Sequence, residues 1–393
     1  MDFSEYKKGT VAVWAGEGDL NVCGAVTTPI VKSVAFAYND LDEWHNVATG
    51  KAEGFIYSRN TNPTVAALEE KIRLLEYGEA ATSFATGMAA ISNTLFTFLT
   101  PGMRVVSLKD TYGGTSKIFL DFLPVYNVDV KLCDTTDHEQ IEAEIAKGCD
   151  LLYLETPTNP TLKIVDIKRL AAAAKKVGAI VVVDNTFATP VNQNPLLLGA
   201  DLVLHSATKF LCGHSDAMGG VLCGKKELVQ KVFQFREING ASLQADPAYL
   251  IARGMKTLEL RIERQNASAL TIARYLKAHP KVSDVFYPGL ETHPGHDIAK
   301  AQMAGFGGIM SFSLNGGYEL VKKMLPKLKL VHLAASLGSV STLAGPPRTT
   351  SHVELTEAQR AMLGIPESLI RYSVGIENVG DLLGDLEQAL AAL

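Results

Sequence analysis

Apolar residues recur along this chain with two different spacings, and each spacing predicts one kind of element. Spacings of three and four residues predict helices over residues 65–76, 88–99 and 167–177. Short apolar runs of buried-strand length lie at residues 104–108, 128–133, 151–155, 180–184, 202–205 and 219–222. Buried strands separated by helices predict an α/β fold whose central sheet is mainly parallel and covered on both faces.

The pattern changes on either side of this region. Before it, glycines and prolines punctuate an irregular N-terminal arm, residues 1–55, of the kind that often reaches onto a partner subunit. Residues 56–250 form the expected main domain. A helical stretch over residues 248–279, with room for a bend, leads into a smaller α/β C-terminal domain at residues 251–393. Its expected elements are strands at 282–287, 308–314, 330–334 and 369–375 and helices at 318–325 and 379–393.

Composition excludes several classes of protein. The 393 residues are 47% hydrophobic and 20% charged, which is typical of a globular protein. The net charge of −5 comes from interspersed acidic and basic residues, so no nucleic-acid partner is expected. No apolar run approaches the roughly 18 residues that span a membrane, and the N-terminus lacks the order of a signal peptide. Five cysteines without a CxxC pair favour reduced thiols and a cytoplasmic protein.

Two reactive side chains follow neighbouring strands of the predicted sheet. Asp184 ends one strand, and Lys209 comes shortly after the next. Ligands of α/β proteins bind at the carboxyl ends of such strands. Alone, Asp184 suggests a helix cap and Lys209 a solvated loop residue. Together they match the needs of pyridoxal 5′-phosphate (PLP), which requires a lysine for its Schiff base and a carboxylate to keep the pyridine nitrogen protonated.

Further residues suit the other parts of this cofactor. Gly87 opens an apolar helix, whose first N–H groups can hold a phosphate, and Ser206 and Thr208 add hydroxyl groups. Tyr112 follows the strand at 104–108 and can stack on a flat ring, although a half-buried packing tyrosine is an alternative interpretation.

Long ordered motifs make the chain resemble a known family. They are YSRNTNPT at 57–64, ETPTNP at 155–160, DNTFATP at 184–190, GADLVLHSATKFLCGHSD at 199–216 and LIRYSVGIE at 369–377. With them the chain resembles the PLP-dependent enzymes of cysteine and methionine metabolism, the group of cystathionine γ-synthase, cystathionine γ-lyase and methionine γ-lyase. The resemblance covers nearly the whole chain and implies the aspartate-aminotransferase-like fold, fold type I of the PLP enzymes.

The resemblance also implies roles for particular residues. Lys209 carries the cofactor and moves protons, Asp184 pairs with the pyridinium, and Tyr112 stacks on the ring and assists proton transfer. The implied phosphate ligands are Gly87, Met88, Ser206 and Thr208 of one subunit with Tyr57 and Arg59 of a neighbour. Asn159 lies near the ring hydroxyl. Arg371, with Ser336, binds the substrate α-carboxylate through a guanidinium fork.

Positions implied to contact the leaving group differ from those of the relatives. Methionine γ-lyases carry a cysteine where this chain has Gly114, so we expect extra room there. Cystathionine-specific relatives carry a glutamate at the position of Ser341. The Arg236-Glu237 pair resembles the lysine–aspartate pair of methionine γ-lyases, and Glu237 offers a place for a cationic leaving group.

The resulting hypothesis is a PLP-dependent γ-lyase or γ-replacement enzyme acting on homoserine-type amino acids. Thioether, O-acyl and guanidinooxy leaving groups, the last as in canavanine, all stay open. So do a cystathionine or cysteine β-lyase, an O-acylhomoserine sulfhydrylase and an aminotransferase. A non-enzymatic binding protein is disfavoured because the reactive residues are all present. The histidines of 293–296 complete no recognised ligand set, so no metal is expected. Shared phosphate ligands imply a homo-oligomer, expected to be a tetramer built from two dimers.

Overall fold

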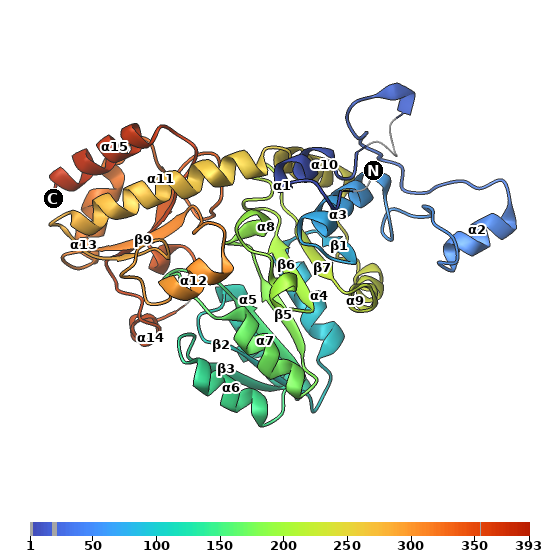
Figure 1. The fold of residues 1–393 in the computed structure, drawn as a ribbon, viewed down its shortest axis with the longest axis horizontal. Coiled ribbons are helices and arrows are strands. Elements are labelled where there is room, and N and C mark those ends of the chain that lie inside the picture. Colours follow the sequence, from blue (N-terminus) through green and yellow to red (C-terminus); the bar gives the residue numbers. More distant parts are fainter. Residues whose placement is uncertain (1–2, 18–21, 354) are drawn as a thin grey trace.

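The computed structural model describes residues 3–17, 22–353 and 355–393. Two α/β units lie side by side, and the long helix α11 (Leu258–Ala278) runs from the larger unit into the smaller one (Figure 1). A segment that contains α2 (Leu41–Ala48) projects away from both units. None of the described helices combines the length and apolar character that a membrane crossing requires.

The larger unit is built on a sheet with the strand order β1-β7-β6-β5-β4-β2-β3. The strands are β1 (Ala80–Phe84), β2 (Arg104–Leu108), β3 (Asp129–Cys133), β4 (Leu151–Glu155), β5 (Ile180–Asp184), β6 (Leu202–Ser206) and β7 (Gly220–Gly224). Only β7 runs antiparallel to its neighbours β1 and β6, so the prediction of a mainly parallel sheet is confirmed. Strand β1 was not predicted, because its sequence AATSF carries few large apolar residues.

Helices cover both faces of this sheet. They are α3 (Pro63–Leu75), α4 (Gly87–Phe98), α5 (Gly113–Lys117), α6 (His138–Ala146), α7 (Ile167–Lys176), α8 (Thr189–Asn192), α9 (Lys226–Asn239) and α10 (Ala245–Met255). Alternate residues of β4 enter different cores: Leu151 and Tyr153 pack in one cluster, and Leu152 and Leu154 in another. All four side chains are fully buried, which explains why the strand is a continuous apolar run.

The smaller unit has a sheet with the order β10-β11-β12-β9-β8. Its strands are β8 (Val282–Phe286), β9 (Ile309–Leu314), β10 (His332–Leu333), β11 (Leu343–Gly345) and β12 (Leu369–Ser373). Besides α11, its helices are α12 (His296–Gln302), α13 (Tyr318–Met324), α14 (Glu357–Met362) and α15 (Val379–Ala391). The helical stretch predicted over 248–279 is divided into α10 and α11 by a break at Lys256 and Thr257.

The N-terminal arm differs from its prediction. Residues 1–2 and 18–21 of it lie outside the described residues, but α1 (Lys8–Trp14) is a regular helix. It packs on α3 and α11 and buries Val11 and Ala12 in the main core. The expectation of an irregular arm is therefore wrong for this stretch, because a seven-residue helix shows too few turns for a clear period. The boundaries at residues 55 and 250 stay predictions.

Candidate active site

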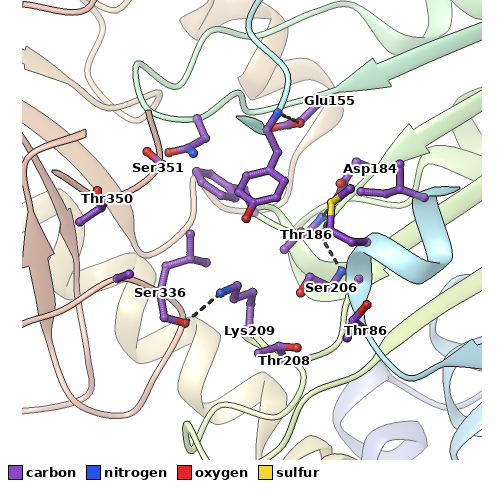
Figure 2. Close-up of a pocket in the computed structure, with 18 of the residues that line it drawn as sticks. Thr86, Glu155, Asp184, Thr186, Ser206, Thr208, Lys209, Ser336, Thr350 and Ser351 are labelled. Carbon is purple, nitrogen blue, oxygen red and sulfur yellow. Dashed lines mark hydrogen bonds between the residues drawn. The ribbon is translucent and has the colours of Figure 1, made fainter. Parts of the chain in front are cut away.

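A cavity of about 300 Å³ opens where β4, β5 and β6 end. Side chains of the large unit form one wall, and Ser336, Thr350 and Ser351 face them from the small unit (Figure 2). The cavity brings together most of the residues predicted from the sequence. These are Gly87, Met88, Tyr112, Asn159, Asp184, Ser206, Thr208, Lys209, Ser336 and Arg371.

One end of the cavity suits a phosphate group. Gly87 is the first residue of α4, and Thr86 caps the helix by accepting a hydrogen bond from the N–H of Ala89 at 3.0 Å. The N–H groups of the first two helical residues have no partner within the helix. A Cβ on Gly87 would lie 2.8 Å from the Cβ of Ser206, so only glycine leaves this corner open. The open corner, the hydroxyl of Ser206 and the helix N-terminus fit an anionic group.

Lys209 stands in the middle of the cavity. Its Nζ donates a hydrogen bond to Oγ of Ser336 at 2.9 Å (Figure 2). Burial, with a smaller contribution from the charge of Arg371, lowers the pKa of Lys209 from 10.5 to about 8. At neutral pH a larger fraction of this amine is therefore neutral and nucleophilic than for a solvated lysine.

Two buried carboxyl groups end adjacent strands. Asp184 of β5 pairs in register with Glu155 of β4. Burial raises the pKa of both groups, more strongly for Glu155, while hydrogen bonds from Thr186 oppose the rise for Asp184. A buried carboxylate at a cavity wall is stabilised by a cation. Asp184 therefore fits the protonated ring nitrogen of PLP.

Glu155 was not predicted as a site residue. Its carboxylate accepts a hydrogen bond from the backbone N–H of Tyr112 at 2.8 Å, which fixes the start of the turn that carries the tyrosine ring. The signal was present in the sequence, because Glu155 ends a buried strand as Asp184 does. Its position at the carboxyl end of a strand therefore makes Glu155 a candidate site residue as well.

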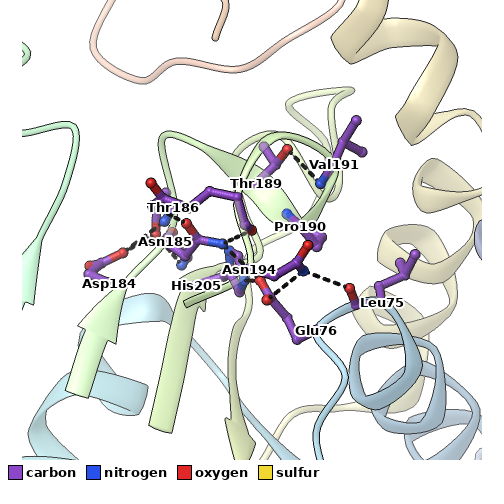
Figure 3. Close-up of polar contacts among 12 residues, drawn as sticks. Leu75, Glu76, Asp184, Asn185, Thr186, Thr189, Pro190, Val191, Asn194 and His205 are labelled. Atoms are coloured by element: carbon purple, nitrogen blue, oxygen red, sulfur yellow. Dashed lines mark hydrogen bonds and ion pairs between the residues drawn. The ribbon is translucent and has the colours of Figure 1, made fainter. Parts of the chain in front are cut away.

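A buried polar network lies next to Asp184 (Figure 3). Glu76, just after α3, contacts Nε2 of His205 through Oε1 at 2.6 Å. It also accepts hydrogen bonds from the side chains of Asn185, at 2.9 Å, and Asn194, at 3.1 Å. Glu76 and His205 are almost completely buried. The network ties α3 to the ends of β5 and β6, which carry the site.

Arg371 of β12 is a buried residue of the small unit that lines the cavity. Its guanidinium donates to Oδ1 of Asn159 and to the carbonyl of Ser336, both at 3.0 Å. Burial lowers the pKa of Arg371 to about 10, so it remains cationic at neutral pH. Among the described residues no carboxylate forms an ion pair with it. A buried guanidinium without an anionic partner fits a substrate carboxylate.

Five predicted residues, Gly114 among them, do not line this cavity. Tyr57 and Arg59 lie outside it, with the guanidinium of Arg59 5.2 Å from the Tyr57 ring centroid. Glu237 accepts a hydrogen bond from the Asn60 side chain at 2.5 Å, and Ser341 contacts Oγ of Ser339 at 3.3 Å. In a single chain these side chains therefore make no contact with the cavity.

The expectation of extra room beside Gly114 is wrong. A Cβ at this position would lie 2.8 Å from Sδ of Met88 and 3.0 Å from Cε1 of Tyr112. The space that a larger residue would occupy is thus already taken by Met88 and the tyrosine ring. The sequence could not show this, because Met88 comes from a different helix.

The site combines a lysine, a carboxylate and a helix N-terminus suited to an anion at the carboxyl ends of a mainly parallel sheet. These features define a PLP enzyme of fold type I. Comparison with known proteins narrows the class. The family model described as Cys/Met metabolism PLP-dependent enzyme matches residues 9–391. The chain therefore belongs to the Cys/Met metabolism family of PLP-dependent enzymes, and PLP is its cofactor.

Individual relatives are similar over their whole length. The chain is 43% identical over 393 residues to the L-methionine gamma-lyase of Fusobacterium nucleatum subsp. polymorphum, with 99% of both chains covered. It is 43% identical to the cystathionine gamma-synthase of Mycobacterium leprae, covering 97% of this chain and 96% of that one. The crystal structure of cystathionine gamma synthase from Xanthomonas oryzae pv. oryzae in complex with aminoacrylate and cysteine superposes with a TM-score of 0.93 at 39% identity, covering 98% of each chain.

Proposed function

We propose that this enzyme catalyses γ-elimination or γ-replacement on homoserine-type amino acids. The observation that carries the proposal is the link from Lys209 through Ser336 to Arg371. Lys209 donates to the Ser336 hydroxyl, and Arg371 donates to the Ser336 carbonyl. The lysine that carries the cofactor and an arginine suited to a carboxylate therefore contact the same residue, Ser336. Such an arrangement suits an α-amino acid with its amine at the cofactor and its carboxylate at Arg371.

The residues of the chain divide the work of such a reaction. The Arg371 guanidinium binds the substrate carboxylate and fixes the orientation of Cα relative to Lys209. When bound, PLP withdraws electrons from Cα and so makes the α-proton removable. Lys209, whose pKa lies at about 8, would take that proton, deliver it to the cofactor and, neutral again, take one from Cβ. The Tyr112 phenol, at the same cavity, assists proton transfer as the γ-substituent leaves.

The leaving group is the finer part of the proposal. Relatives named methionine gamma-lyase, cystathionine gamma-lyase and cystathionine gamma-synthase support thioether chemistry. Thioether, O-acyl and guanidinooxy leaving groups all remain within the proposal. Glu237 contacts Asn60, next to Arg59, so we place Glu237 with the residues that face a neighbouring subunit. In that position the Glu237 carboxylate would bind a cationic leaving group of a substrate in the neighbouring subunit's cavity.

A shared site makes the functional unit a homo-oligomer. Tyr57 and Arg59 are exposed and lie away from their own cavity, as the proposal that they bind a neighbour's phosphate requires. A dimer is the minimum, and a tetramer built from two dimers is the proposed assembly. The cysteines of the described chain form no disulfide, which agrees with the reducing cytoplasm as the proposed compartment.

A substrate panel tests the reaction. We expect 2-oxobutanoate, or a thioether product when cysteine is added, from at least one of L-methionine, L-cystathionine, an O-acylhomoserine and L-canavanine. Lys209→Ala is the control, and it should lose both this activity and the visible absorption of the bound cofactor. Pyruvate as the only oxo acid would indicate a β-lyase instead. Absence of 2-oxobutanoate, homoserine and thioether with every substrate would rule the proposal out.

A further inference from the structure

The turn that carries Tyr57 and Arg59 is held from inside the protein by a buried arginine. Arg236 of α9 has only 2% of its surface exposed. Its Nη2 donates to the backbone carbonyls of Asn60 and, at 3.5 Å, of Arg59. Its Nη1 donates to the carbonyl of Ser83 in β1 at 2.9 Å. One guanidinium therefore joins the central sheet to the backbone of this turn.

A second contact fixes the same carbonyl group. Oγ of Ser242 donates to the carbonyl of Arg59 at 2.6 Å. The backbone of Ser242 forms an isolated antiparallel β-bridge with Phe84 at the end of β1. The backbone of Arg59 is thus held by two donors, whereas its side chain and that of Tyr57 are exposed. These contacts hold the backbone of the turn in place, while the side chains of Tyr57 and Arg59 face away from the protein interior.

Arg236 occupies a costly position for a purely structural residue. Burial lowers the pKa of Arg236, and the nearest carboxylate, Glu69, is 3.6 Å away and already bonded to Ser83. The Nε of Arg236 has no hydrogen-bond partner. A buried charge with incomplete pairing is unfavourable for stability alone, since an apolar residue of similar size would avoid this cost.

We propose that Arg236 and Ser242 are positioning residues that hold Arg59 and Tyr57 in place for the cofactor phosphate of the neighbouring subunit. The inference rests on the shared site of the proposed function. Both Nη atoms of Arg236 donate to backbone carbonyls within its own chain, so these two groups hold the turn and do not reach a substrate.

Mixed oligomers test this role. Two differently tagged chains are co-expressed, and oligomers that contain both are purified over both tags. In such an oligomer, Arg236→Met should behave as Arg59→Ala does. It should regain activity when paired with Lys209→Ala, which still supplies an intact Arg59, and should regain none when paired with Arg59→Ala. The homo-oligomer of Arg236→Met should bind PLP at least about tenfold more weakly in an equilibrium titration, a loss of about 1.4 kcal/mol.

Controls keep the result interpretable. Lys231→Met removes a positive charge from an exposed position of the same helix and should change neither cofactor affinity nor complementation. If Arg236→Met does not fold, Ser242→Ala replaces it, with the same pairing behaviour and a smaller loss of affinity. The positioning role is overturned if the substituted chain fails to complement Lys209→Ala or restores activity with Arg59→Ala, or if its PLP affinity matches wild type. Failure of the reference pair, Arg59→Ala with Lys209→Ala, would instead refute the shared site itself.

Discussion

Burial sets the charge of the side chains that line the cavity. The pKa of Lys209 falls to about 8 because its ammonium loses water, and the charge of Arg371 lowers it further. Arg371 is buried too, but its pKa of about 10 keeps it cationic, so it can still bind an anion. The same environment therefore produces a reactive amine and a permanent cation next to each other.

This arrangement predicts how the apoenzyme captures its cofactor at different pH. Only the neutral amine of Lys209 attacks an aldehyde, so the capture rate should rise with pH and level off above about 8. Arg371→Gln removes a positive charge that lowers the pKa of Lys209, so its curve should shift to higher pH. The measurement is the rate of visible absorption after mixing apoenzyme with PLP. Superimposable curves for the two proteins would contradict the electrostatic coupling.

The elements that carry the site are held together by buried polar contacts as well as by apolar packing. Glu76 joins the end of α3 to β5 and β6, through Asn185 and His205 respectively (Figure 3). Lys8 of α1 donates to Oδ1 of Asn194 at 2.6 Å and so extends the network to the N-terminal helix. These contacts give the carboxyl ends of β5 and β6 a common support.

Removing Glu76 should therefore destabilise the protein strongly. Glu76→Ala leaves several buried donors without an acceptor and should cost about 3–5 kcal/mol of unfolding free energy. Glu76→Gln keeps an acceptor oxygen and should cost clearly less. Urea unfolding followed by circular dichroism measures both. Glu291→Ala, at an exposed position, is the control and should stay within about 0.5 kcal/mol of wild type. Equal losses for the two Glu76 variants would show that its acceptor role is unimportant.

At the scale of the whole molecule, a single chain leaves a large apolar surface exposed. Its projecting segment exposes large apolar side chains that have no cover in one subunit: Val26, Ile30, Val34, Leu41 and Trp44. Such a concentration of exposed apolar surface is typical of a protein–protein interface. It lies in the same part of the chain as the turn proposed to reach the neighbouring site, which connects assembly with catalysis.

A charge in this surface should weaken the assembly without unfolding the subunit. Leu41 is 78% exposed, so Leu41→Glu disturbs no packing within one chain. We expect a smaller mass by light scattering at micromolar concentration, together with weaker retention of PLP. Asn46→Glu introduces the same charge on the polar side of α2 and should leave the mass unchanged. An unchanged mass for Leu41→Glu would place the interface elsewhere.

Much of the fold could be predicted from local pattern, for a definite reason. A strand covered on both faces must be apolar throughout, so β2, β4 and β5 appear as continuous runs with their observed bounds. Strands β1 and β11 escaped prediction because small and polar residues form them, and their burial comes from neighbouring elements. The helix α1 escaped because seven residues show too few turns for a clear period.

The sequence by itself determined the alternation of strands and helices, the position of Asp184 and Lys209 at strand ends, and the family motifs. Tertiary structure alone decided which distant side chains meet. It brought Ser336 to Lys209 across 127 positions of the chain, and it filled the space beside Gly114 with Met88. The physical reason is that periodicity reports whether a residue is buried, whereas the identity of its neighbours depends on how complete elements pack.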